Sequence, residues 1–231
     1  MQHPASDASR FLFGQLEFRQ EAFRAQPNAV HDEDDCRLQM SHFIMLRTLL
    51  AKGVERSEGP FALQYTDLHA SNLFVDENWN IVGVIDLEFV CSLPPSMLEV
   101  PYWFSAQYID GLKKCLEEYN RHVEDFLQVL EEEEIRVNSS LPLGEIIRRA
   151  WVSGEYWIYN CLTSINAMPN LMEDHIWRQF GFQPSLSEET AFTRSLSHFW
   201  SEQSDDFVKQ KVCDKRQYND EVTLLYNSID L

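Results

Sequence analysis

The amino-acid sequence predicts an α+β fold that is predominantly helical, and two observations support this prediction. Apolar residues recur at spacings of three and four over most of the chain, which is the period of an amphipathic helix. Residues 61–86 break this pattern with short apolar runs separated by turn-forming residues, which is typical of strands. The chain of 231 residues, 44% of them hydrophobic, is long enough to fold around a full core.

The N-terminal part predicts a short element followed by one helix. Residues 1–30 contain several phenylalanines and favour a short element docked on the rest of the protein. Apolar positions between residues 40 and 50 predict a longer helix, preceded by the acidic run 31–35. Acidic residues complement the dipole at a helix N-terminus, and Gly53 is a suitable helix end.

The central part predicts three strands and the C-terminal part predicts helices. The expected strands are residues 61–65, 73–75 and 81–85, the last two joined by a turn at residues 76–80. Beyond residue 105 the periodicity predicts helices over these ranges: 112–130, 146–162 and 192–200. We therefore expect a helix, a small β region and then a helical bundle.

The composition excludes several classes of partner. With 37 acidic against 19 basic residues, the net charge is −18. Such a surface repels nucleic acid and anionic membranes, whereas it suits a cationic small molecule or one bound through Mg²⁺. The five cysteines stand singly, which favours a reducing compartment. No signal peptide is visible and no apolar run approaches the roughly 20 residues that span a bilayer, so we expect a cytoplasmic protein.

Three oxygen-bearing side chains are expected to meet at one place. Asp67 and Asn72 stand five residues apart, and Asp86 follows the apolar run 81–85. If 73–75 and 81–85 pair as a hairpin, residues 72 and 86 lie side by side at its open end. There they can share a hard cation such as Mg²⁺, with Asp67 one short loop away and close enough to act on a hydroxyl.

This segment resembles a known family. The string TDLHASNLFVDENWNIVGVIDLEF is similar to the catalytic segment of the aminoglycoside phosphotransferases, which have a protein-kinase-like fold. The resemblance implies that Asp67 is the catalytic base and that Asn72 and Asp86 hold the Mg²⁺ ions that bridge the phosphates of ATP. His69 occupies the position at which protein kinases often place a lysine near the transferred phosphate. A structural, hydrogen-bonding role for His69 is an equally open reading. Two readings of Glu88 are also open: it helps to shape the metal or substrate site, or it is a solvated or helix-linked carboxylate.

The resemblance implies an ATP- and Mg²⁺-dependent transfer of a phosphoryl group to a small-molecule hydroxyl. By the same resemblance, residues 1–231 form a single kinase-like C-terminal lobe, with the catalytic segment at residues 61–104 and a helical remainder at 105–231. The acceptor and the oligomeric state cannot be read from the sequence.

The sequence also departs from the family pattern. No Gly-rich GxGxxG loop occurs, and the only lysine before Asp67 is Lys52, at the end of the preceding helix. The N-terminal ATP-binding lobe is therefore expected to be missing, through a truncated protein or an incomplete gene. Tyr65 stands where the family usually has a histidine, and Leu87 where it has a tryptophan.

Two alternatives follow from these departures. One is an inactive kinase-like lobe that serves as a binding or scaffold module. The other is a Mg²⁺-dependent hydrolase that uses the same acidic residues.

Overall fold

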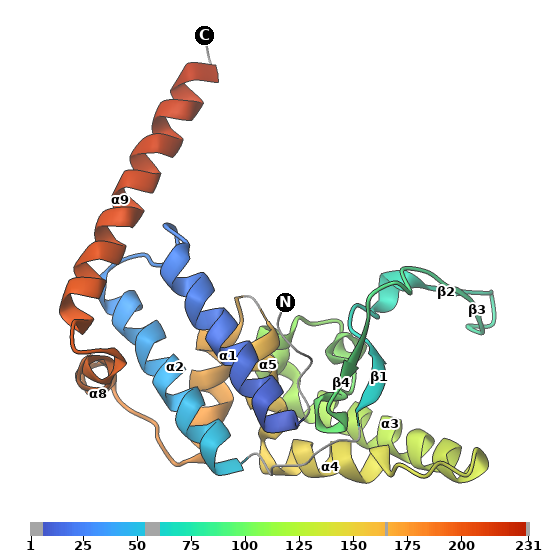
Figure 1. Cartoon of the computed structure of the whole chain (residues 1–231). Coiled ribbons are helices and arrows are strands. Elements are labelled where there is room, and N and C mark those ends of the chain that lie inside the picture. Colours follow the sequence, from blue (N-terminus) through green and yellow to red (C-terminus); the bar gives the residue numbers. More distant parts are fainter. Residues whose placement is uncertain (1–6, 54–60, 165, 230–231) are drawn as a thin grey trace. The chain divides into compact units, whose positions relative to one another are not determined.

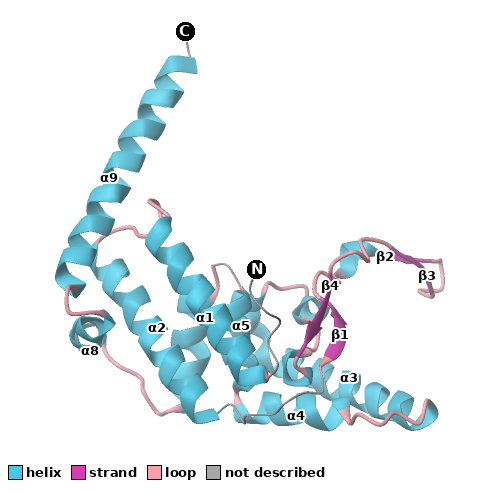
Figure 2. Ribbon diagram, viewed as in Figure 1, coloured by secondary structure: helices cyan, strands magenta, loops and turns pink. Residues whose placement is uncertain are grey.

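The structure is a computed structural model that describes residues 7–53, 61–164 and 166–229. These residues are predominantly helical with two small antiparallel sheets, which confirms the expected α+β class (Figures 1 and 2). The chain divides into two compact units, Met1–Ala8 with Glu55–Asn160 and Ser9–Val54 with Cys161–Leu231. The expectation of a single lobe over residues 1–231 stays a prediction.

The unit that contains Ser9–Val54 is built from helices. Its elements are α1 (Ala8–Ala25), α2 (Glu33–Gly53), α6 (Met168–Leu171), α7 (Trp177–Gln179), α8 (Leu186–Ser197) and α9 (Ser204–Ile229). Helix α1 is longer than the short element expected, whereas α2 begins with three acidic residues and ends at Gly53, as expected. Arg37 of α2 joins three helices, because its guanidinium donates to Ser197 Oγ at 3.2 Å and to Asp205 Oδ1 at 2.8 Å.

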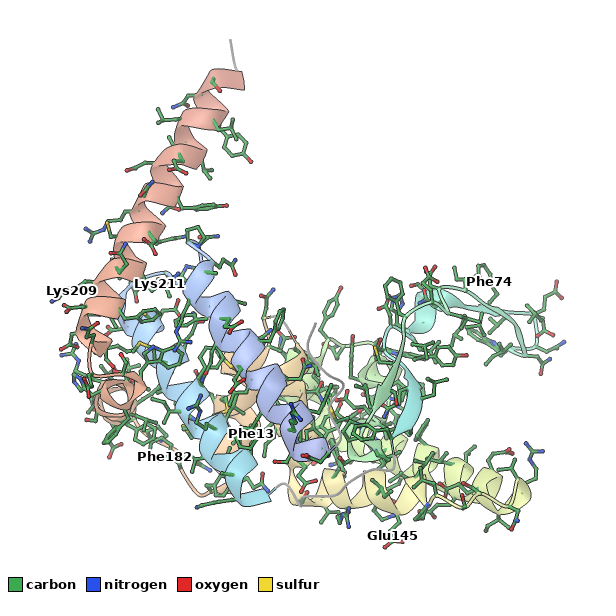
Figure 3. The ribbon with its side chains drawn as sticks, viewed as in Figure 1. Phe13, Phe74, Glu145, Phe182, Lys209 and Lys211 are labelled. Carbon is green, nitrogen blue, oxygen red and sulfur yellow. The ribbon has the colours of Figure 1, made fainter. Side chains whose placement is uncertain are left out.

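A buried lysine closes the C-terminal end of α1. Lys211 of α9 is 1% exposed, and its Nζ donates to the main-chain oxygens of Arg24 and Gln26. Burial lowers the pKa of Lys211, and Asp214 opposes that effect. A cation at a helix C-terminus is favourable because it meets the negative end of the helix dipole. Figure 3 labels Lys211 together with Lys209, which is exposed on the same helix.

Replacement of this lysine should destabilise the protein. We expect Lys211→Met to lower the free energy of unfolding by about 2 kcal/mol, because the part-buried hydrogen bonds to the carbonyls of Arg24 and Gln26 are lost while the apolar stem is kept. Lys209→Met on the same helix should change it by less than about 0.5 kcal/mol, since an exposed ion pair contributes little. Urea denaturation of both variants measures the difference, and equal effects would contradict the capping role.

The other unit contains the sheets and three longer helices. Strand β1 (Ala62–Tyr65) pairs with β4 (Val90–Leu93), and β2 (Leu73–Val75) pairs with β3 (Ile81–Val84). Helices α3 (Leu116–Arg136), α4 (Leu143–Ser153) and α5 (Glu155–Thr163) follow, with α5 in this unit as far as Asn160. Short helical turns at Ala70–Asn72, Pro95–Met97, Tyr102–Ser105 and Ile109–Cys115 connect them.

Three features of this unit differ from the sequence prediction. Strand β4 was not expected, and α3 begins at Leu116 because Ile109–Cys115 is a tighter 3₁₀ turn. The single helix expected over 146–162 is two helices, since Gly154 adopts a left-handed conformation (φ +79°) and ends α4. A glycine without a Cβ takes this conformation at little cost, which makes it a common helix end.

The described residues contain no helix long and apolar enough to cross a membrane.

Candidate active site

Asn72 is fixed at the base of a short loop. It is 3% exposed, and its backbone amide donates to His69 O at 2.9 Å in the turn Ala70–Asn72. Its side-chain Nδ2 donates to Asp67 O at 2.8 Å. The loop from Asp67 to Asn72 is therefore closed by the asparagine side chain itself. Because the amide nitrogen is engaged, the Oδ1 atom is the group of Asn72 left to accept a donor or bind a cation.

The β2–β3 hairpin brings Asp86 to the same end as Asn72. Leu73 is opposite Val84, and the amide of Ile85 donates to Asn72 O at 3.0 Å. Asp86 is thus the residue directly after the partner of Asn72, one position beyond the expected pairing. Its backbone is in the left-handed region (φ +57°), which turns the chain away from the hairpin. Non-glycine residues adopt this region rarely, and Asp is one that tolerates it.

The turn of the hairpin forms as the sequence predicts. Asp76 Oδ1 accepts hydrogen bonds from the amides of Asn78 and Asn80, and Trp79 has a positive φ of 66°. Hydrogen bonds from the side-chain amide of Asn80, and then from these two backbone amides, lower the pKa of Asp76. The turn fixes the register of β2 and β3, which has one irregularity between Phe74 and Val75. The register in turn determines that Asn72 and Asp86 lie at the open end of the hairpin.

Asp67 and His69 lie on the exposed side of the loop. The Asp67 carboxylate is exposed, and its Oδ1 atom is 3.8 Å from His69 Nε2. The other ring nitrogen of His69, Nδ1, is 2.6 Å from Ser71 Oγ. His69 is therefore held from within the loop and faces Asp67, which agrees with a structural as well as a phosphate-facing reading. The exposed Tyr65, Leu87 and Glu88 flank this region.

The loop is supported by the segments that follow the hairpin. Trp103 Nε1 donates to Leu68 O at 3.0 Å, and the Thr66 amide donates to Phe89 O at 2.9 Å. The carbonyl of Leu68 is thereby tied to Tyr102–Ser105, and the amide of Thr66 is tied to Phe89 in the chain entering β4. Positions of groups that act in catalysis need such fixed supports.

Sequence reasoning missed an acidic group, Glu99, that acts electrostatically on Tyr102. Glu99 accepts a hydrogen bond from Asn160 Nδ2 at 2.7 Å, and burial raises the pKa of Glu99 to about 8 against the effect of that bond. Burial also raises the pKa of Tyr102, with further contributions from the carboxylates of Glu99 and Asp67. Tyr102 therefore lies within electrostatic range of both carboxylates. The signal available was the position of Glu99 among apolar and aromatic residues, Leu98 to Trp103.

The oxygen donors at the hairpin end fit a magnesium ion by their chemistry. Mg²⁺ prefers one or two protein oxygen ligands together with water and substrate phosphates. Asn72 Oδ1 and the exposed Asp86 carboxylate are such ligands. No group of three His, Cys, Asp or Glu side chains that could hold a metal occurs among the described residues.

An Asp on a short loop, an Asn five residues later and a second Asp after a hairpin are the residue set of kinase-like phosphoryl transfer. Residues 2–97 match the model of the phosphotransferase enzyme family (APH), which confirms the resemblance to aminoglycoside phosphotransferases. The match includes Asp67, His69, Asn72 and Asp86, and it extends upstream through α1 and α2. No curated protein and no solved structure matches the chain.

Proposed function

We propose that the chain is an ATP- and Mg²⁺-dependent phosphotransferase that acts on a hydroxyl of a small molecule. The observation that supports this most directly is the closed loop and hairpin that hold Asp67, Asn72 and Asp86 at one end of β2–β3. All three residues lie in the segment that matches the phosphotransferase family. An acidic surface with a net charge of −18 favours an acceptor that carries an amine.

The residues of the site have separate roles in this proposal. The exposed carboxylate of Asp67 orients the acceptor hydroxyl and takes its proton. Asn72 Oδ1 and Asp86 hold Mg²⁺, which supplies positive charge next to the nucleotide phosphates. His69, between Ser71 and Asp67, orients the Asp67 carboxylate or faces the transferred phosphate. Rigid support from Trp103 and the hairpin limits the motion of the loop.

Nucleotide binding tests the proposal directly. We expect titration of the protein with ATP in excess Mg²⁺ to give measurable heat, and Asp86→Asn to weaken the binding at least tenfold. Asparagine is chosen because it tolerates the left-handed backbone at this position. Glu77→Gln removes one charge at the opposite end of the same hairpin and should leave the affinity unchanged. No binding at millimolar nucleotide, or equal losses in both variants, would contradict the proposal.

A non-catalytic binding module is the second candidate function. It is favoured by the exposed apolar side chains of the sheets around the site, among them Phe74 and Phe89. Asp67→Asn separates the two candidates: a phosphotransferase keeps nucleotide binding and loses phosphoryl transfer to amino-alcohol acceptors by at least about a hundredfold. A binding module shows neither nucleotide binding nor transfer.

A further inference from the structure

The β2–β3 hairpin and the β1–β4 pair each expose large apolar side chains, which we call the β surface. It is defined by Leu63, Phe74, Trp79, Ile81, Val82 and Phe89, each more than half exposed. Leu63 is 79% and Trp79 83% exposed. Exposed apolar residues that stand singly are normal, whereas several large ones on a single short hairpin, such as Phe74, Ile81 and Val82, favour a surface that binds a partner. Figure 3 shows Phe74 on this hairpin.

Among the described residues, none covers either face of the β2–β3 hairpin. Successive side chains of a strand point to opposite faces, and the neighbouring residues Phe74 and Val75 are both exposed, as are Ile81 and Val82. A two-stranded hairpin is only marginally stable in water without a surface to pack on. The β2–β3 hairpin therefore gains stability from any partner that covers it.

The strands also leave backbone groups unpaired. Each of the four described strands pairs with one neighbour only, so every strand has one open edge (Figure 2). An open edge offers a row of N–H and C=O groups to another extended segment. The apolar side chains and the open edges together favour a strand-forming partner.

The charge of the β surface selects the partner. Residues 61–112 contain no lysine and no arginine, whereas Asp67, Asp76, Glu77, Asp86 and Glu88 are acidic. A second copy of this chain would bring the same acidic groups together, which is unfavourable. The lysines and arginines of the described residues all lie on helices, so a second copy has no described basic strand to offer.

We propose that the β surface binds an extended segment of a different protein in which lysine or arginine alternates with apolar residues. The segment adds a strand to the open edge of β3 or β2, its apolar side chains cover Phe74, Ile81 or Val82, and its cations meet the acidic residues of the hairpin.

Labelled peptides test the partner chemistry. We expect the full chain to bind a peptide of alternating lysine and valine, followed by fluorescence anisotropy, at least tenfold more tightly than the matched glutamate–valine peptide. A helix-forming peptide with the same number of lysines should bind as weakly as the glutamate peptide. Equal affinity for the helix-forming peptide would contradict the inference that the partner binds as an added strand. No binding of the lysine–valine peptide at millimolar concentration would overturn the proposal as a whole.

Surface variants test the location. Val82→Lys should weaken binding of the lysine–valine peptide at least tenfold, because it removes apolar contact and adds a like charge. Leu224→Ser on α9, a position that is also exposed, should leave binding unchanged. Equal losses of affinity in both variants would show that the peptide binds unspecifically, and would overturn the assignment of the binding site to the β surface. A dimer in sedimentation velocity that Val82→Lys abolishes would assign the β surface to a second copy and overturn the choice of a different protein.

Discussion

Acidification from pH 6.5 to 3 should lower the free energy of unfolding by up to about 5 kcal/mol through one side chain, His42. His42 of α2 is fully buried, its ring lies 5.6 Å from that of Trp177, and neither ring nitrogen has a partner among the described residues. Burial lowers its pKa from 6.5 to about 3. The unfolded chain takes up a proton below pH 6.5 and the folded chain does not, so stability is present above pH 6.5 and is lost as the pH falls.

The variant that isolates this effect is His42→Phe, which keeps a ring of similar shape. Urea denaturation between pH 3 and 7 should show a smaller acid slope than in the unmodified protein. At pH 7 the variant should be more stable by about 1–2 kcal/mol, because two unsatisfied buried polar atoms are removed. His31→Gln, at an exposed histidine, should keep the original slope. An unchanged slope in His42→Phe would show that other groups cause the acid loss.

Glu99 should produce the opposite dependence at higher pH. Its pKa is raised from 4.5 to about 8, so the folded protein retains a proton that the unfolded chain releases. Stability from this group is complete below pH 4.5 and is lost as the pH rises to 8. Part of the side chain is in contact with water, so we expect a loss of about 2–4 kcal/mol instead of the full value of about 5 kcal/mol.

Glu99→Gln should remove this loss and stabilise the protein at pH 8. The amide oxygen of glutamine can still accept the hydrogen bond from Asn160, so the packing is kept while the titration is lost. Glu145→Gln, at an exposed position of α4, serves as the matched control and should leave the slope between pH 5 and 8 unchanged. If Glu99→Gln is less stable than the unmodified protein at pH 8, the ionised carboxylate is a stabilising group and the prediction is wrong.

Local features of the fold were predictable from the sequence. The acidic start and glycine end of α2, the turn at Asp76 and the strands of the hairpin depend on residues close together in the chain. Strand β4 was missed because it forms by pairing with β1, more than 20 residues upstream. The break at Gly154 was missed because apolar periodicity continues through the glycine, and only the backbone conformation separates α4 from α5.

The residues of the candidate site also fall into two groups, those that the sequence predicted and those that it did not. Asp67, Asn72 and Asp86 could be proposed because one loop and one hairpin connect them. Glu99 and Tyr102 could not, since tertiary packing brings Tyr102 within electrostatic range of Asp67 and Glu99, and burial raises the pKa of both Glu99 and Tyr102. A spacing pattern holds no information on burial, and burial is what shifts these pKa values.

At position 86 the residue with the least backbone strain differs from the residue that can bind a cation, because the backbone there is left-handed. Glycine would adopt the same φ of 57° without the strain that a Cβ brings, roughly 1–2 kcal/mol. Glycine, however, has no oxygen to offer to a cation. The hydrogen bond between Ile85 and Asn72 and the pairing of β2 with β3 hold the strained residue in place. The pairing of the hairpin thus offsets the conformational cost of a residue with a Cβ at this positive φ, and the carboxylate of Asp86 is kept at this position.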